Sequence, residues 1–310
     1  MHLKQLDLNL LIALDALLTE RSITEAGRRV YLTQSAMSGA LSRLREYFGD
    51  ELLTQVGRKM VPTPLGESLA GPVRDILMRI KSTVATRPAF DPAASTRRFT
   101  LMMSDYVCTV LMPQVLRRGE SEAPRIGFDV LLNDVVNPFE LLDRADIDFL
   151  IMPQMFLGKE HPSEFLYSDG YACLVWAENP MVGESLTREQ YLDLGHVVLQ
   201  YSRTRAAFID EWFLTKLGVT RRAEVFAPNF NAVPQLVVGT RRIATIQRRL
   251  AEFYARYLPL RIIAPPFELP VLDEAIQWHR NFDADPASRW VRSLVLEVAK
   301  GVEPALLQTA

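Results

Sequence analysis

Polar side chains between residues 34 and 48 suggest a specific chemistry by their types and spacing. They include an amide, three hydroxyls and a guanidinium group, on Gln34, Ser35, Ser38, Ser42 and Arg45. Steps of three and four residues place such side chains on one face of a helix. Amide and guanidinium groups bind base edges and phosphates of DNA, and short hydroxyl side chains allow close approach to the major groove. We therefore expect this face to contact DNA, with an ordinary solvated helix surface as the alternative.

Two basic residues, Arg58 and Lys59, follow at the tip of a hairpin that we predict between residues 51 and 61. A basic tip beside such a helix can contact the DNA backbone or the minor groove. We expect both side chains to contribute to DNA binding.

The sequence lacks the motifs of an enzyme. Its four histidines and two cysteines do not have the spacing of a metal site. It contains no phosphate-binding glycine loop, dinucleotide fingerprint or nucleophile elbow. We therefore expect no enzyme activity, no metal and no cofactor. Two alternatives remain open here, namely an enzyme fused to a helical head and a ligand-binding protein whose head serves only for dimerisation.

The bulk composition is that of a globular chain with more than one domain. Its 310 residues are 48% hydrophobic and 23% charged, and no apolar run approaches the roughly 20 residues needed to span a bilayer. The first residues do not have the layout of a signal peptide, so we expect a cytoplasmic protein without a membrane partner. Cys108 and Cys173 lie in apolar segments, which predicts two buried free thiols.

Charge is distributed unevenly along the chain. Residues 1–98 carry 14 basic and 10 acidic side chains, whereas residues 99–310 carry 21 basic and 27 acidic ones. A basic first part on an acidic remainder fits a protein of which one part meets phosphate.

The elements that position the polar face are predicted by caps and apolar periodicity. A helix is expected from Leu8 to about Thr19. Ser22 and Glu25 form a capping box that begins a second helix. Thr33 caps the third helix, which carries the polar face and ends at Gly49. With the hairpin, these helices form a winged helix-turn-helix.

A long helix follows the hairpin. Thr63 is its predicted N-cap and Pro64 its first residue. An apolar stripe runs along it through Leu65, Leu69, Val73, Ile76, Ile80 and Val84. Such a stripe predicts a helix–helix dimer seam. Pro72 interrupts one backbone hydrogen bond and is expected to bend the helix.

The order of these elements, together with Asp7 to Leu11 and Leu32 to Ser38, resembles the LysR-type transcriptional regulators. Within that family the chain is most similar to the nodulation regulators of rhizobia, and next to regulators of aromatic-compound degradation. The most similar segments are Leu8 to Glu20, Tyr47 to Arg58, Val61 to Pro64, Gly195 to Val197, Arg242 to Thr245 and Asp285 to Ser288.

The resemblance implies the domain organisation. We expect a winged helix-turn-helix domain over residues 1–62, a linker and dimerisation helix over 63–91 and an effector-binding domain over 92–310. The last is expected to be α/β, because short strands and helices alternate along it. The family implies two subdomains joined by two crossover strands with a ligand cleft between them, as in periplasmic binding proteins. Subdomain I would comprise 92–165 and 270–310, and subdomain II 166–269.

The resemblance also implies roles in DNA binding. Gln34, Ser35 and Ser38 match residues that contact DNA, and Arg43 matches a basic position associated with the phosphate backbone. The wing usually carries a Leu-Phe-x-Arg motif. Here it reads Leu52 to Gln55 without the Phe and the Arg, so Arg58 or Lys59 is left to supply the missing charge.

The effector site is predicted at strand ends, where helix N-termini offer free amides. Ser104 and Asn231 stand at such junctions, and Arg249 matches an arginine that lines the cleft in the aromatic-responsive regulators. His196 and Arg203 flank a further strand and loop. Aromatic lining is expected from Tyr106, Phe156, Tyr201, Phe208 and Phe230.

We accordingly expect a planar aromatic inducer with phenol, carbonyl or carboxylate groups, held by Ser104, His196 and Arg249. It would be flavonoid-like, a (halo)phenol or an aromatic acid. The alternative is that His196 only packs, and that Phe208 and Phe230 belong to the core. The expected protein is an allosteric transcriptional activator. Its expected partners are double-stranded promoter DNA, RNA polymerase, the inducer and further copies of itself, as a dimer through the linker helix or a tetramer.

Overall fold

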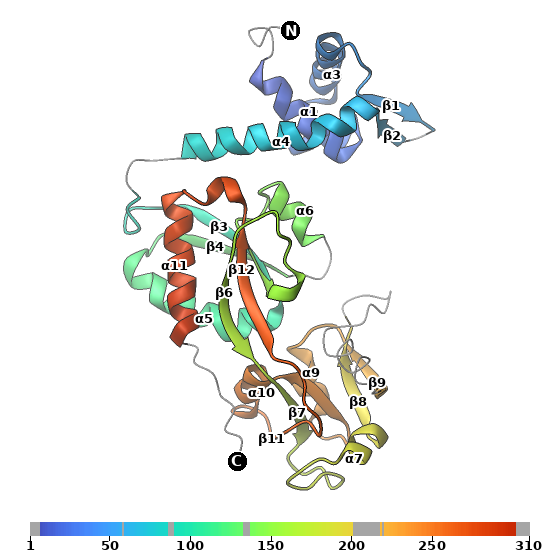
Figure 1. Cartoon of the computed structure of the whole chain (residues 1–310), viewed down its shortest axis with the longest axis vertical. Helices are drawn as coiled ribbons and strands as arrows, with labels where there is room; N and C mark the ends of the chain where they lie inside the picture. Colours follow the sequence, from blue (N-terminus) through green and yellow to red (C-terminus); the bar gives the residue numbers. More distant parts are fainter. Residues whose placement is uncertain are drawn as a thin grey trace. The chain divides into compact units, whose positions relative to one another are not determined.

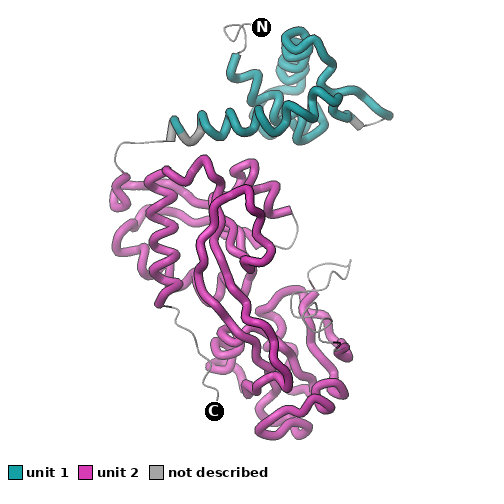
Figure 2. Tube along the Cα trace, in the orientation of Figure 1, with its two compact units in different colours: residues 1–87 teal, residues 88–310 magenta. Residues whose placement is uncertain are grey.

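The chain forms two compact units, residues 1–87 and residues 88–310, which we call the head and the body (Figure 2). The computed structural model describes residues 7–57, 59–85, 90–132, 137–200, 218 and 220–301. The fold is the expected one, a winged helix-turn-helix head and a body of two α/β subdomains.

The head consists of α1 (Leu8–Glu20), α2 (Ile23–Arg29), α3 (Gln34–Phe48), β1 (Leu53–Val56), β2 (Lys59–Pro62) and α4 (Pro64–Ala85) (Figure 1). Its core is built from the apolar faces of the helices and includes Leu14, Leu17, Met37 and Leu44, none of which is exposed. β1 and β2 pair antiparallel as the wing. The three helices and the hairpin thus enclose one core that holds α3 in place.

Local signals fix the helix ends of the head. The Ser22 side chain accepts a hydrogen bond from the Glu25 amide, and Thr33 accepts one from the Ala36 amide. The predicted capping box is incomplete, because the Glu25 carboxylate accepts from Arg28 instead. A tight turn between α2 and α3 requires Gly27, where an added Cβ would lie 2.8 Å from a backbone oxygen.

Helix α4 contributes to the head core as well as leading away from it. Leu65, Leu69 and Leu77 pack against this core and Val73 is buried in it, whereas Ile76 is 45% exposed. Pro72 lies inside the helix without ending it. The first half of the predicted stripe, Leu65, Leu69 and Val73, therefore belongs to the head core, and Ile76 is left exposed.

The first sheet of the body has the strand order β4-β3-β5-β12-β6. Its strands are β3 (Arg98–Met103), β4 (Gly127–Leu132), β5 (Phe149–Pro153), β6 (Ser163–Asp169) and β12 (Leu272–Trp278). The helices in its part of the chain are α5 (Asp105–Glu122), α6 (Pro138–Asp143), η2 (Gln154–Phe156), η3 (Arg280–Phe282) and α11 (Pro286–Gly301). β3 runs parallel to β4 and β5, and β12 runs antiparallel to β5 and β6.

The second sheet has the strand order β11-β7-β10-β8-β9. Its strands are β7 (Tyr171–Trp176), β8 (Gly195–Leu199), β9 (Arg222–Ala227), β10 (Ile243–Gln247) and β11 (Leu260–Ile263), with helices α7 (Arg188–Asp193), α9 (Ala232–Val237) and α10 (Arg248–Ala255). The predicted helix over residues 206–217 lies outside the described residues.

The chain crosses between the two subdomains twice, from β6 to β7 at Gly170 and from β11 to β12 (Figure 1). β6 pairs with β12 as far as Asp169, so the division that we placed after residue 165 falls inside β6. One apolar core runs through both subdomains and includes Val107, Phe149, Ala244 and Ile246. The two subdomains of the body are therefore packed together rather than only tethered.

Both thiols are free, and Cys173 is buried whereas Cys108 is only half-buried. Among the described residues no helix is long and apolar enough to cross a membrane. The same part of the chain contains no cluster of His, Cys, Asp and Glu that could hold a metal ion.

Candidate functional site

The predicted contact face of α3 is exposed. Gln34, Ser35, Ser38, Ser42 and Arg43 all lie on the surface of the head, while Met37, Ala40, Leu41 and Leu44 of the same helix are buried. Ser35 shares a hydrogen bond of 3.1 Å with the cap residue Thr33. The arrangement presents an amide, hydroxyls and a guanidinium group beside the N-terminus of a helix, where free backbone amides attract phosphate.

Gly39 belongs to this face, although sequence reasoning did not identify it. It is exposed, and no atom lies within 4 Å of the position of an added Cβ. A glycine inside a helix costs roughly 0.5–1 kcal/mol relative to alanine, and packing within the head does not explain it. The lack of a side chain at Gly39 leaves a flat helix surface that another molecule can approach.

Arg45 does not share the exposed position of the other predicted contacts. Its Nε donates to the Glu51 carbonyl over 2.9 Å, and its Nη2 donates to the Leu53 carbonyl over 2.8 Å. The same Nη2 lies 2.9 Å from a carboxylate oxygen of Glu51. The structure corrects the prediction for this residue, because its guanidinium binds the base of the wing.

The wing differs from expectation at Gln55, whose side-chain amide donates to the Gly57 carbonyl over 3.1 Å. Gln55 thus stabilises the turn at the wing tip in place of offering a charge. Lys59 lies in β2, but its side chain is not among the described ones. Arg58 lies outside the described residues.

In the body, Ser104 caps α5 by accepting a hydrogen bond from the Val107 amide over 3.2 Å. The cap uses one lone pair of the hydroxyl oxygen, and the hydroxyl hydrogen can still be donated to a ligand. Ser104 is half-buried at the start of α5. This is the position that we predicted, at the junction between a strand and a helix.

The first turn of α5 is bonded to the second subdomain through Asn231. The Asn231 amide donates to Asp105 Oδ2 over 2.8 Å, and Thr109 Oγ1 donates to the side-chain oxygen of Asn231 over 3.1 Å. The Tyr254 hydroxyl donates to that oxygen over the same distance. Asn231, predicted to contact the effector, instead joins the subdomains.

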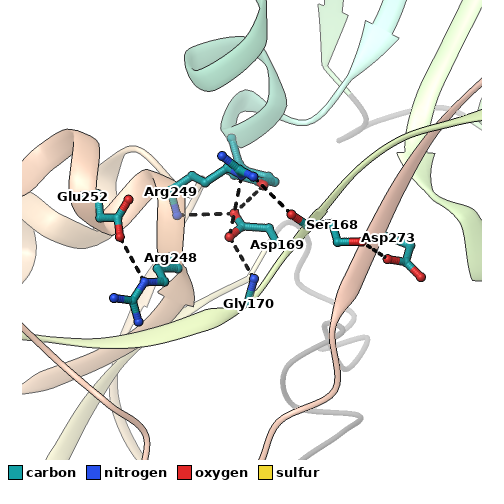
Figure 3. A network of polar contacts seen from close by, with 8 residues as sticks. Ser168, Asp169, Gly170, Arg248, Arg249, Glu252 and Asp273 are labelled. Carbon is teal, nitrogen blue, oxygen red and sulfur yellow. Dashed lines mark hydrogen bonds and ion pairs between the residues drawn. The ribbon is translucent and has the colours of Figure 1, made fainter. Parts of the chain in front are cut away.

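Arg249 is held where the chain crosses between subdomains, and Figure 3 shows it beside Asp169. Its backbone amide donates to Asp169 Oδ2 over 3.3 Å, and its Nη2 donates to the Ser168 carbonyl over 3.3 Å. Nε lies 4.0 Å from Asp169 Oδ1, and the side chain is 11% exposed. Arg249 therefore binds the end of β6 from the start of α10.

Asp169 gathers further hydrogen bonds at the same place. The Tyr106 hydroxyl donates to Oδ2 over 2.6 Å, and the Gly170 amide donates to Oδ1 over 2.8 Å. Burial nevertheless raises the pKa of Asp169 to about 6, against the lowering effect of Tyr106 and Arg249. Tyr106, a predicted lining residue, is buried and edge-on to Phe230, so both aromatic rings belong to the core.

Glu274 on β12 is a second buried carboxyl group, and only 1% of it is exposed. It is the register partner of Tyr167 on β6. Among the described residues Glu274 Oε2 has no hydrogen-bond partner. Burial and, second, the charge of Asp169 raise the pKa of Glu274 to about 8. Burial likewise raises the pKa of Tyr106 and of Tyr167 well above the usual value.

The prediction for His196 is corrected by the structure. The side chain is fully buried in β8, its Nε2 lies 2.7 Å from the Tyr191 carbonyl oxygen, and its ring packs edge-on against Tyr191. Because it lies between β8 and α7, it is a packing residue.

Of the remaining predicted residues, the structure describes only Phe156. Phe156 lies on η2 and is 43% exposed. Tyr201, Arg203 and Phe208 lie outside the described residues. Sequence reasoning missed Asp169 and Glu274. No local signal marked them, because both strands contain other polar residues as well.

Comparison with known families matches two long segments of the chain. Residues 8–67 match the bacterial regulatory helix-turn-helix proteins of the lysR family, and residues 93–300 match the LysR substrate binding domain.

Individual relatives are similar to the chain over nearly their full length. Nodulation protein D 1 of Bradyrhizobium diazoefficiens is 43% identical over 303 residues, which is 97% of this chain and 96% of that protein. Nodulation protein D 2 of Rhizobium tropici is 44% identical, covering 96% and 95% of the two chains. The crystal structure of the probable transcriptional regulator PA0477 from Pseudomonas aeruginosa is similar with a TM-score of 0.64 at 28% identity, covering 94% of this chain and 97% of that one.

Proposed function

The chain belongs to the LysR family of bacterial transcriptional regulators, and from that premise we propose that it activates promoters in response to a small aromatic inducer bound by its body. Members of this family bind promoter DNA and small effectors, which decides against an enzyme fused to a helical head. We place its action in the cytoplasm, where promoter DNA is.

For the head, we propose that Gln34, Ser35, Ser38 and Ser42 face the major groove and that Arg43 binds phosphate. Their common exposure on α3 supports this assignment. Arg58 and Lys59 at the wing tip would add backbone or minor-groove contacts. Because direct readout needs side chains that reach base edges, Gln34 is the residue best suited to select a base.

For the body, one observation carries the proposal: the helix that Ser104 caps is bonded by its first turn to the second subdomain. An inducer that accepts a hydrogen bond from the Ser104 hydroxyl would disturb the contact between α5 and Asn231 and the neighbouring Asp169–Arg249 pair. Its binding would favour one angle between the subdomains over another. The Ser104 hydroxyl, which can still donate a hydrogen bond, suits a ligand with phenol, carbonyl or carboxylate oxygens.

The signal would reach DNA through the assembly. We propose a dimer that forms through α4 and pairs into a tetramer, so that the inter-subdomain angle sets the spacing of the heads. Half-site spacing follows the geometry of the assembly, and a change in spacing alters DNA bending and access for RNA polymerase.

The inducer assignment is tested by thermal-shift measurements on the full chain with a flavone, salicylate and a chlorophenol. A ligand that binds only the folded chain stabilises it by RT ln(1 + L/Kd), where L is the free ligand concentration, so the melting temperature rises with ligand concentration. At least one of these compounds is expected to raise it, and Arg249→Ala is expected to remove most of that rise while site-specific DNA binding persists.

The matched control is Arg248→Ala. Arg248 is the preceding residue on α10 and pairs with Glu252 over 3.0 Å at the surface (Figure 3), so its loss should leave the ligand-induced rise intact. Equal rises in wild type and Arg249→Ala would show that Arg249 has only a structural role.

A further inference from the structure

A group of hydrogen bonds in the head joins three elements that the DNA-binding role treats separately: the end of α3, the wing and the start of α4. Arg45 forms the first part of it. Two of its three guanidinium nitrogens donate to the carbonyls of Glu51 and Leu53, which enter the wing. A guanidinium group presents its donors in a rigid fork, and here that fork is directed into the protein.

Asp50 forms the second part. Its Oδ1 accepts from the Leu52 amide and from the Thr63 hydroxyl, both over 2.6 Å. These two hydrogen bonds lower the pKa of Asp50. Thr63 Oγ1 in turn accepts from the Gly66 amide over 3.0 Å, which makes it the N-cap of α4. One carboxylate oxygen thus connects the first wing strand to the cap of the linker helix.

The backbone at Leu52, between Asp50 and Thr63, has a strained conformation and packs closely against the start of α4. Leu52 has a left-handed φ of 59°, which is strained for a residue with a branched side chain, and its side chain is fully buried. Its carbonyl accepts from the Thr63 amide over 3.0 Å. An added Cβ on Gly66 would lie 2.3 Å from that carbonyl oxygen. Such a conformation persists only where the surroundings hold it.

We propose that Arg45 and Asp50 are positioning residues that fix the wing to α3 and to the start of α4, so that the wing, the reading face and the linker helix move as one body. Neither side chain touches DNA. This inference rests on the proposed function, in which the exposed face of α3 reads DNA and α4 carries the signal from the body.

Arg43 provides a matched comparison on the same helix. It is exposed, and within the described part of the chain no hydrogen bond or ion pair engages its guanidinium group. Arg43 is the candidate for a phosphate contact, whereas Arg45, two residues away, is engaged by the wing. The same substitution at the two positions therefore separates contact from positioning.

The first measurement is the salt dependence of DNA affinity for the full chain, on a duplex selected from random sequences by the wild type. Each phosphate contact contributes about 0.9 to the slope of log K against log salt. Arg43→Ala should reduce the slope by about 0.9 per head. Arg45→Ala should weaken binding by about tenfold, as expected for the loss of charge-assisted hydrogen bonds, and leave the slope unchanged.

The second measurement reads the position of the wing directly. Val56 on β1 is 61% exposed, so Val56→Cys can carry a chelated-iron reagent that cleaves nearby DNA, in a chain whose Cys108 and Cys173 are replaced by alanine. The wild-type head should give one narrow cleavage cluster. Arg45→Ala and Asp50→Ala should broaden or shift that cluster, whereas Arg43→Ala should leave its position unchanged.

Conservative variants distinguish the loss of these hydrogen bonds from a loss of folding. Asp50→Asn retains an oxygen that can accept both hydrogen bonds and should restore the narrow cluster. If Arg45→Ala melts below the assay temperature, Arg45→Lys keeps the charge and the stem without the fork, and it should show the same broadening.

Two results would overturn the proposal. A salt slope reduced by Arg45→Ala as much as by Arg43→Ala would make Arg45 a phosphate contact. An unchanged cleavage cluster in a folded Arg45→Ala or Arg45→Lys head would make it a stabilising residue only. The proposed function fails differently: Ser38→Asp and Arg43→Ala would then bind the selected duplex like the wild type.

Discussion

Asp169 and Glu274 are two buried carboxyl groups on strands that lead across between the subdomains of the body. Their pKa values are raised to about 6 and about 8, in both cases first by burial. The polar groups around them are Tyr106, Tyr167 and Arg249. At neutral pH Glu274 is therefore protonated and can donate a hydrogen bond, while Asp169 is an anion.

This pair predicts how the stability of the body depends on pH. In the unfolded chain Glu274 ionises near the ordinary glutamate pKa of 4.5, and in the folded chain only near 8. Between these values the folded chain holds a proton that the unfolded chain has released, so the free energy of unfolding falls as pH rises. Asp169 acts with the same sign between the ordinary aspartate pKa of 3.8 and about 6.

We expect Glu274→Gln to be close to neutral at pH 5 and to stabilise the full chain at pH 8, by at most a few kcal/mol, since one pKa unit is about 1.4 kcal/mol. Urea unfolding of wild type and variant at both pH values measures it. A variant that is equally destabilised at pH 5 and pH 8 would show that the ionisation of Glu274 does not shape the stability curve.

At the residue scale, the sequence was sufficient where a role depends on local pattern. Exposure of Gln34, Ser38 and Arg43 follows from helical periodicity around the buried Met37 and Leu41. The sequence was insufficient where the partners of a residue lie far away along the chain.

Asn231 and Asp105 are 126 positions apart, and no local pattern reveals that they meet. The engagement of Arg45 by the wing was not predicted, because two of its acceptors are backbone carbonyls, which any sequence would supply. The same holds for His196, which lies close to a backbone carbonyl oxygen of α7.

At the scale of elements, helix positions were predictable because caps and periodicity are local. Ser22 and Thr33 cap α2 and α3 as expected. A complete capping box is present instead at Thr187 and Gln190 of α7, a short helix that periodicity did not reveal.

The apolar stripe of α4 is the instructive case. Periodicity identifies an apolar face but not its partner, and the first half of this one faces the head core. Among the stripe side chains that the structure describes, Ile76 is the clearly exposed one, so we expect the dimer seam to use it.

Ile76→Asp should therefore leave the head folded and reduce the mass of the oligomer that the full chain forms in sedimentation. DNA affinity should fall about tenfold or more, because two linked heads bind with higher avidity than one. Val73→Asp is the contrasting control on the same stripe. Val73 is only 3% exposed, and a charge there should unfold the head, as helix content in circular dichroism would show. An unchanged mass for Ile76→Asp would place the seam elsewhere.

At the scale of the whole molecule, the chain combines a basic head with an acidic body. The charge of residues 1–98 is positive and that of the remainder negative, which favours one orientation of the chain on DNA. The body consists of two subdomains packed around one core and joined at Asn231 and at Arg249. A ligand can shift such a body only by binding its two arrangements with different affinity.

The central claim is that an inducer bound by the body changes how the heads are spaced on DNA without changing what each head reads. A hydroxyl-radical footprint of the full chain on its selected duplex, with and without the compound that raises the melting temperature most, tests it directly. We predict that base preference within each half-site stays the same while the spacing of the protected half-sites or the bend between them changes. An identical footprint at saturating compound would contradict the account.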